Sequence, residues 1–99
     1  MLNINKTIEN GKAVLVPEGR LDTITAPDLE NTIKEIIPGL TELVFDLEKL
    51  EYVSSAGLRV LLSAQKQMNK QGEMKVKNVS NTIMEIFEVT GFSEILTIE

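Results

Sequence analysis

The residue types most suited to chemistry gather in one segment, residues 52–59, which contains two adjacent hydroxyls, Ser54 and Ser55. The segment joins an apolar run to a helical pattern, and α/β proteins place their sites in loops beyond the carboxyl ends of strands. At a helix start, free N–H groups and the helix dipole favour a capping hydroxyl or a phosphate. Gly57 lacks a Cβ, so another surface could approach its backbone closely.

The same residues have a plainer explanation. Ser is among the commonest helix N-caps, so Ser54 or Ser55 could serve only as a cap and Gly57 only as a packing residue. The segment lacks the Gly-Lys-Ser/Thr ending of a Walker A loop, and it does not match a Gly-x-Ser-x-Gly nucleophile elbow. Spacing alone therefore leaves the choice open between a structural cap and a binding site.

Composition excludes several classes of chemistry. The 99 residues include no Cys and no His, which rules out disulfides, thiol nucleophiles, Cys/His zinc sites and imidazole-based triads. Glu48 and Glu51 flank the serine segment, but two carboxylates without a pocket or a metal set are weak support for acid–base catalysis. We therefore assign no catalytic residue, no metal site and no cofactor, and expect an interaction module rather than an enzyme.

Charge and hydropathy restrict the partners and the location. The net charge of −5 argues against nucleic acid, because phosphate backbones are bound by basic patches. No apolar run approaches the roughly 18–20 residues that span a bilayer, and the first residues do not resemble a signal peptide. Apolar residues make up 42% of the chain and charged residues 25%, as in ordinary globular proteins. We expect one domain over residues 1–99, in the cytoplasm, without a membrane partner.

The elements that must position the serine segment follow from periodicity and turn signals. Alternation predicts a strand over residues 2–8, and Asn10–Gly11 predicts a hairpin turn into a strand over 13–16 that bends or ends near Pro17 and Gly19. Thr25, answered by Asp28, predicts a helix start. The remaining expected elements are a helix over 26–37, a strand over 43–47, a helix from about 58 to 71, a strand over 74–78, a helix over 81–90 after a Ser80 or Asn81 cap, and a turn with a short edge strand over 92–98.

This order predicts an α/β fold. Helices that alternate with strands require parallel neighbours, whereas the opening hairpin supplies an antiparallel pair. We expect a mixed, mostly parallel β-sheet packed by α-helices.

Three segments together resemble the STAS family of bacterial anti-sigma factor antagonists and their relatives. These are Gly19-Arg20-Leu21-Asp22, Val53-Ser54-Ser55-Ala56-Gly57-Leu58 and Glu85-Ile86-Phe87-Glu88-Val89-Thr90-Gly91-Phe92. The similarity extends over almost the whole chain and implies a STAS-like fold.

The resemblance implies a regulatory function in transcription. In such proteins a Ser or Thr is phosphorylated by an anti-sigma factor that is also a serine kinase, and a serine phosphatase is a further partner. Aligned on Gly57–Leu58, Ser55 takes the phosphoacceptor position, and Asp22 matches an acidic residue beside it. The partner-binding residues that the resemblance implies are Asp22, Ser54, Ser55, Ala56, Gly57, Leu58 and Arg59.

The chain departs from the family pattern within this motif. Ser54 stands where the family has Asp, Ala56 follows the acceptor, and Arg59 stands where the family has its last Gly. The loss of the Asp favours an alternative, in which the domain is not phosphorylated and works as a scaffold or a nucleotide-sensing subunit of a larger regulatory assembly.

Overall fold

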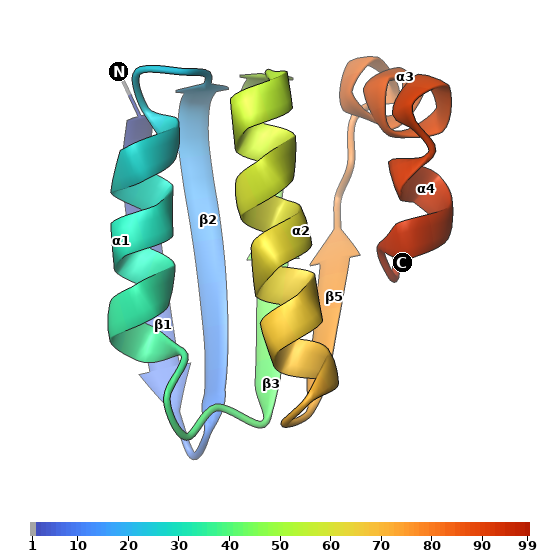
Figure 1. Cartoon of the computed structure of the whole chain (residues 1–99). Helices are drawn as coiled ribbons and strands as arrows, with labels where there is room; N and C mark the ends of the chain where they lie inside the picture. The colour runs from blue at the N-terminus through green and yellow to red at the C-terminus, as the bar shows by residue number, and fades with distance from the viewer. Residues whose placement is uncertain (1) are drawn as a thin grey trace.

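A mixed sheet covered on one face by two helices forms the body of the protein (Figure 1). The computed structural model describes residues 2–99. Within that range, the strands are β1 (Leu2–Glu9), β2 (Lys12–Leu21), β3 (Glu42–Asp46), β4 (Leu50–Val53) and β5 (Glu73–Lys77). The helices are α1 (Ala26–Ile36), α2 (Ser55–Asn69), α3 (Asn81–Thr90) and α4 (Phe92–Ile95).

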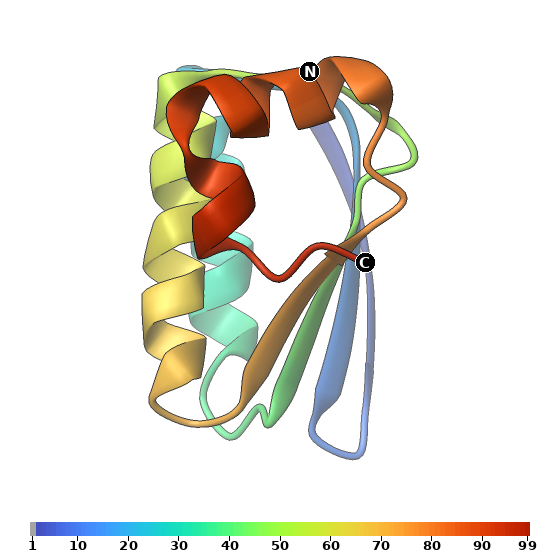
Figure 2. The ribbon, with the colours of Figure 1, turned by 90° about the vertical axis from the view of Figure 1, so that its right-hand side faces the viewer.

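The strand order confirms the expected mixed α/β sheet. β1 pairs with β2 antiparallel, as the hairpin signal predicts. β2 then pairs parallel with β3 over its first half and with β4 over its second half, and β3 pairs parallel with β5. Seen from the side, α1 and α2 form a layer against one face of the sheet, while α3 crosses one end of the molecule (Figure 2).

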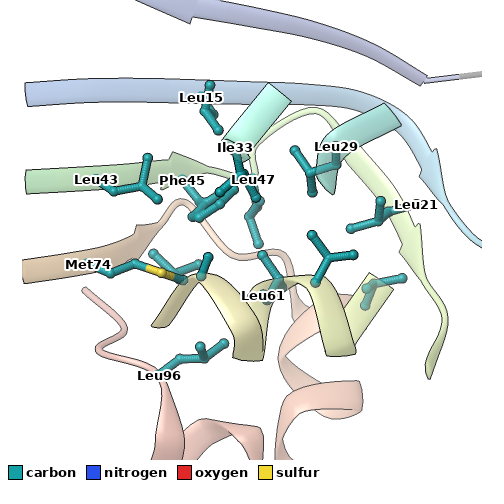
Figure 3. Close-up of a cluster of buried hydrophobic side chains, with 14 of the residues drawn as sticks. Leu15, Leu21, Leu29, Ile33, Leu43, Phe45, Leu47, Leu61, Met74 and Leu96 are labelled. Atoms are coloured by element: carbon teal, nitrogen blue, oxygen red, sulfur yellow. The ribbon is translucent and has the colours of Figure 1, made fainter. Parts of the chain in front are cut away.

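The core lies between the sheet and the two helices. Alternate residues of β2 point into it: Ala13 and Leu15 are fully buried. Phe45 of β3 and Leu61 of α2 meet there with further leucines and Met74 (Figure 3). Burial of these apolar side chains holds the two helices against the sheet, and thereby fixes where the loops at the ends of the strands lie.

β2 runs through Pro17 to Leu21 as one strand, so the prediction that it could end there is wrong. The backbone N–H of Gly19 donates to the carbonyl of Lys49 at 3.1 Å, so odd-numbered residues of β2 direct their N–H groups toward β3 and β4. Pro17 lies between Leu15, the last residue paired with β3, and Gly19, the first paired with β4. Its missing N–H therefore costs no bond in the sheet. The pairing shifts register at Gly19, whose φ is +112°.

Two short elements were not expected from the sequence. The first is β4, which lies in residues 48–53, between the expected strand over 43–47 and the serine segment, and which pairs parallel with the end of β2. Residues 92–98 form the four-residue α4 rather than a turn, followed by a single parallel bridge from Ile98 to Val76 in place of an edge strand. No helix among residues 2–99 is both long enough and apolar enough to cross a bilayer.

Candidate functional site

The ends of β2 and β4 bring Asp22 and the serine segment to the same end of the sheet. Leu21 and Val53 are parallel partners, and the N–H of Ser54 donates to the carbonyl of Leu21 at 2.8 Å. Asp22 and Ser54 are therefore the residues that follow two neighbouring strand ends. Figure 1 shows this end at the top, where α1 and α2 both begin. The sequence placed both groups after strands, and the structure puts those strands side by side.

Asp22 is held within its own loop. Its Oδ1 accepts hydrogen bonds from the N–H groups of Ile24 (3.0 Å) and Thr25 (3.1 Å) and lies 3.2 Å from the Thr25 hydroxyl. The N–H of Thr25 is the main cause that lowers the pKa of Asp22; desolvation opposes it, and the N–H of Ile24, the Thr25 hydroxyl and the charge of Arg20 add to it. Asp22 is therefore a carboxylate at neutral pH.

Contrary to the prediction, the side chain of Thr25 does not cap α1. It makes no capping side-chain bond, and Asp28 does not answer it. Its buried hydroxyl instead donates to the carbonyl of Arg20 (2.7 Å) and accepts from the N–H of Asp22 (2.9 Å), while the carbonyl of Asp22 accepts from the N–H of Ala26 (2.8 Å). The polar groups of this helix start are thus paired across the β2–α1 loop rather than within the first helical turn.

The two serines have different roles in the structure. Ser54 is the N-cap of α2: its backbone is extended, and its Oγ accepts from the N–H of Gly57 at 3.4 Å. Ser55 is the first residue of the helix, and its side chain is exposed. Helix capping therefore accounts for Ser54, whereas the Ser55 hydroxyl remains accessible at the N-terminus of α2.

Gly57 and Leu58 lie beneath the surface. A Cβ at Gly57 would come within 2.6 Å of the Leu21 side chain and 2.8 Å of that of Val53, so glycine lets α2 pack on the strand ends. The close approach at Gly57 thus comes from the core, where the sequence had suggested an external surface. Leu58 is only 5% exposed. Of the implied partner-binding residues in α2, Ser55 and Arg59 are exposed and Ala56 is partly exposed.

A shallow groove connects the two loops. It has a volume of about 230 Å³ and lies between α1 and α2, with Thr23, Pro27 and Glu30 on one side and Ala56 and Arg59 on the other. Beside it, Ile24 projects from the β2–α1 loop with 85% of its surface exposed. Ile24 is not part of the site predicted from the sequence, although the local pattern Asp22-x-x-Thr25 is a turn signal that leaves the residues between the two side chains outside.

The amino-acid sequence is similar to those of known proteins. The family model of the STAS domain matches residues 3–99. The chain is 33% identical over 91 residues to BtrV of Bordetella bronchiseptica, described as a candidate anti-sigma factor antagonist, covering 90% of this chain and 78% of that protein. It is 29% identical over 97 residues to the anti-sigma-B factor antagonist of Staphylococcus aureus, covering 96% of this chain and 90% of that protein.

Solved structures share the fold. An anti-sigma factor antagonist from Mycobacterium paratuberculosis aligns with a TM-score of 0.89 at 23% identity, over 99% of this chain and 85% of that one. The Bacillus cell fate determinant SpoIIAA in its phosphorylated form aligns with a TM-score of 0.75 at 18% identity, over 100% of this chain and 91% of that one.

Proposed function

Because the chain belongs to the STAS domain family, we propose that it is an anti-sigma factor antagonist that binds an anti-sigma factor when unphosphorylated and is released when Ser55 is phosphorylated. The observation that carries the proposal is that the two adjacent serines have different structural roles. Ser54 is engaged as the N-cap of α2, whereas Ser55 presents an exposed hydroxyl in the first turn. A kinase and a partner both need such an accessible group.

Electrostatics explain how one phosphate could act as a switch. A phosphoserine adds about −1.5 to −2 charges at neutral pH. Within this protein the charge would meet the N-terminus of α2, which favours anions, and Arg59 one turn later. An interface closed around a neutral hydroxyl would instead have to bury an unpaired charge, at a cost of several kcal/mol. Binding is lost while the fold is kept.

The names of relatives support the partner class. The S. aureus relative is named as an anti-sigma-B factor antagonist, and one structural neighbour is a phosphorylated form of SpoIIAA. For this chain we propose two cytoplasmic partners: an anti-sigma factor that is also a serine kinase, and a serine phosphatase that restores the binding form. The partner-binding residues at the surface would be Ser55 and Arg59, which are exposed, and Asp22 and Ala56, which are partly exposed, while Ser54, Gly57 and Leu58 would shape the loop beneath them.

One sequence difference favours a second candidate function. Ser54 replaces the Asp that precedes the acceptor in the family pattern, which removes a charge that a kinase could recognise. In that case the domain would be an unphosphorylated scaffold or a nucleotide-sensing subunit.

Phosphorylation separates the two candidates. The purified chain is incubated with ATP and each serine-kinase anti-sigma factor from the same genome, and intact mass is measured together with the affinity of the two proteins before and after reaction. We expect one added phosphate, lost in Ser55→Ala, and at least about tenfold weaker binding after phosphorylation. Equal affinity of both forms would overturn the switch, and binding without any added phosphate would favour the scaffold.

A further inference from the structure

Two large apolar side chains stand out on the surface. Ile24 is 85% exposed and Val89 is 88% exposed, more than any other large apolar side chain in the described chain. Single exposed apolar residues are common on protein surfaces. These two call for an explanation because of where they lie.

Both residues belong to elements at the end of the molecule that carries Ser55. Ile24 lies in the β2–α1 loop, two residues after Asp22, and Val89 lies in the last turn of α3. α3 packs against β4, the strand that leads into the serine segment. Figures 1 and 2 agree that the start of α2 lies between the β2–α1 loop and α3. Ser55, the first residue of α2, thus lies between the elements that carry the two exposed side chains.

Hydrogen bonds fix the backbone at both residues. The N–H of Ile24 is bound to the Asp22 carboxylate, and the next residue, Thr25, is 5% exposed. α3 is capped by the Ser80 hydroxyl and ends at Gly91, whose φ of +82° closes the helix. A partner that contacts such pre-ordered residues loses little conformational entropy on binding.

The surroundings of Val89 are shaped for an apolar contact. A shallow surface hollow on α3 is lined by Thr82, Glu85, Ile86, Val89 and Thr90. The buried side of the same helix carries Ile83 and Phe87, and Ile86 is partly buried against the core, so Val89 is the large apolar side chain of α3 that is left exposed. Val89 and this hollow are thus available to a partner surface.

The charges in the segments around Ile24 and Val89 indicate the kind of partner surface that these residues fit. Residues 78–99 contain four Glu and no Lys or Arg, and residues 21–33 contain Asp22, Asp28 and Glu30 and likewise no cation. Two cations lie near these segments: Arg59 on α2, and Arg20 on β2, whose guanidinium lies over the Tyr52 ring and whose charge acts on Asp22. Both exposed apolar residues are therefore set in acidic segments, which match a partner surface that is apolar at its centre and lined by Lys and Arg at its edge.

We infer that Ile24 and Val89 are the two apolar anchors by which this protein docks on its anti-sigma factor, one on each side of Ser55, and that they fit apolar sites bordered by basic residues on that factor. The inference rests on the proposed function and adds the residues that give affinity. With an anchor on each side, Ser55 lies inside the desolvated part of the interface, where one added phosphate is most disruptive.

The test compares three variants of the full chain: Ile24→Ser, Val89→Ser and, as a matched control, Ile8→Ser. Ile8 is 51% exposed and lies beside the β1–β2 turn, at the opposite end of the molecule. Affinity for the anti-sigma factor that the parent chain binds is measured by calorimetry at low and high salt. Circular dichroism and melting temperature check each fold; Ile24→Ala and Val89→Ala serve if a serine variant does not fold.

We expect each anchor variant to bind at least about tenfold more weakly than the parent, with Ile8→Ser unchanged. Parent affinity should fall as salt increases. Anchor variants that bind like the parent would overturn the inference and leave the proposed function standing, whereas a parent chain that binds no anti-sigma factor would overturn both. Self-association of the parent that both anchor variants abolish would assign the anchors to a second copy of this chain and would also overturn the inference.

Discussion

Asp22 and Thr25 bind each other reciprocally across the loop between β2 and α1. The N–H of Asp22 donates to the Thr25 hydroxyl at 2.9 Å, and the N–H of Thr25 donates to the Asp22 carboxylate at 3.1 Å. The hydroxyl also reaches the carbonyl of Arg20 at 2.7 Å. The pair fixes the loop that presents Ile24 beside the serine segment, so its disruption has consequences for both stability and binding.

Thr25→Val should destabilise the protein. Valine has nearly the same shape, but it leaves the N–H of Asp22 without its acceptor and the carbonyl of Arg20 without its donor at a site that is only 5% exposed. We expect a loss of about 1–3 kcal/mol in the free energy of unfolding, measured by urea denaturation. Thr25→Ser keeps the hydroxyl and is the matched control. A valine variant as stable as the serine variant would show that these bonds contribute nothing.

Asp22→Asn should change how stability depends on pH. Because the fold lowers the pKa of Asp22 below its usual value of 3.8, the carboxylate stabilises the folded state above that value, and this contribution is lost as pH falls through the lowered pKa. The Asn variant should therefore melt at a lower temperature than the parent at neutral pH, with the difference closing in acid. Melting curves of both proteins across a pH series measure it. A difference that stays constant with pH would exclude a role for the charge.

The same Asp22→Asn samples should lose more in partner affinity than in stability. Asn can still accept the two N–H bonds, so the loop survives, but the negative charge that follows β2 next to the serine segment is gone. Titration with the anti-sigma factor measures the affinity. A large fall in melting temperature with unchanged affinity would reduce Asp22 to a loop residue.

The order of elements could be predicted because hairpin and helix signals are local, whereas β4 depends on a distant partner. Leu50 and Val53 are separated by Glu51 and Tyr52, a pattern too short to indicate a strand by itself. The strand exists because it pairs with the end of β2, about 30 residues earlier in the chain. The missed strand is also the one that places Ser54 beside Asp22.

The site was predictable as a segment but not residue by residue. Ser54 and Ser55 are equally good caps in the sequence, and only the structure shows that Ser54 caps and Ser55 is exposed. The role of Gly57 depends on Leu21, which reaches it through the parallel pairing of β2 with β4. Exposure of this kind is set by long-range packing, which spacing along the chain does not encode.

Gly57→Ala should destabilise the protein although alanine favours helices. The new Cβ would lie 2.6 Å from the Leu21 side chain and 2.8 Å from that of Val53. Both neighbours are almost fully buried, so they have little room to move. Overpacking of this kind costs about 1–3 kcal/mol, which exceeds the helical gain of about 1 kcal/mol. Urea denaturation measures the result. An alanine variant more stable than the parent would mean that the strand ends can repack around the methyl group.

Ser54→Ala should lower the stability of the protein, whereas Ser55→Ala should abolish its phosphorylation. Loss of the Ser54 cap should cost about 0.5–1 kcal/mol, at the low end because its bond to Gly57 is long at 3.4 Å. Loss of the exposed Ser55 hydroxyl should leave stability unchanged but abolish phosphorylation. Thermal melting and tandem mass spectrometry on both variants test the two halves. A phosphate located on Ser54 would place the acceptor one residue earlier.

Ser55→Asp should keep the fold and lose the partner. The first turn of α2 contains no acidic residue, so a carboxylate at its first position should interact favourably with the helix dipole by about 0.3–1 kcal/mol, with Arg59 one turn away as a further partner. The melting temperature should therefore equal or slightly exceed that of the parent. The same charge would be buried without a counter-charge in an interface formed around a neutral hydroxyl, so affinity for the anti-sigma factor should fall by at least about tenfold.

Ser63→Asp is the control for that experiment, because it adds the same charge at an exposed position of α2 two turns beyond the site. Calorimetric titration of the three proteins, together with their circular dichroism spectra, separates a local effect from a general one. If both aspartate variants bind equally weakly, the net charge of the chain controls the affinity. If Ser55→Asp binds as tightly as the parent, charge exclusion at Ser55 is wrong, because a carboxylate at the first position of α2 is then compatible with the bound state.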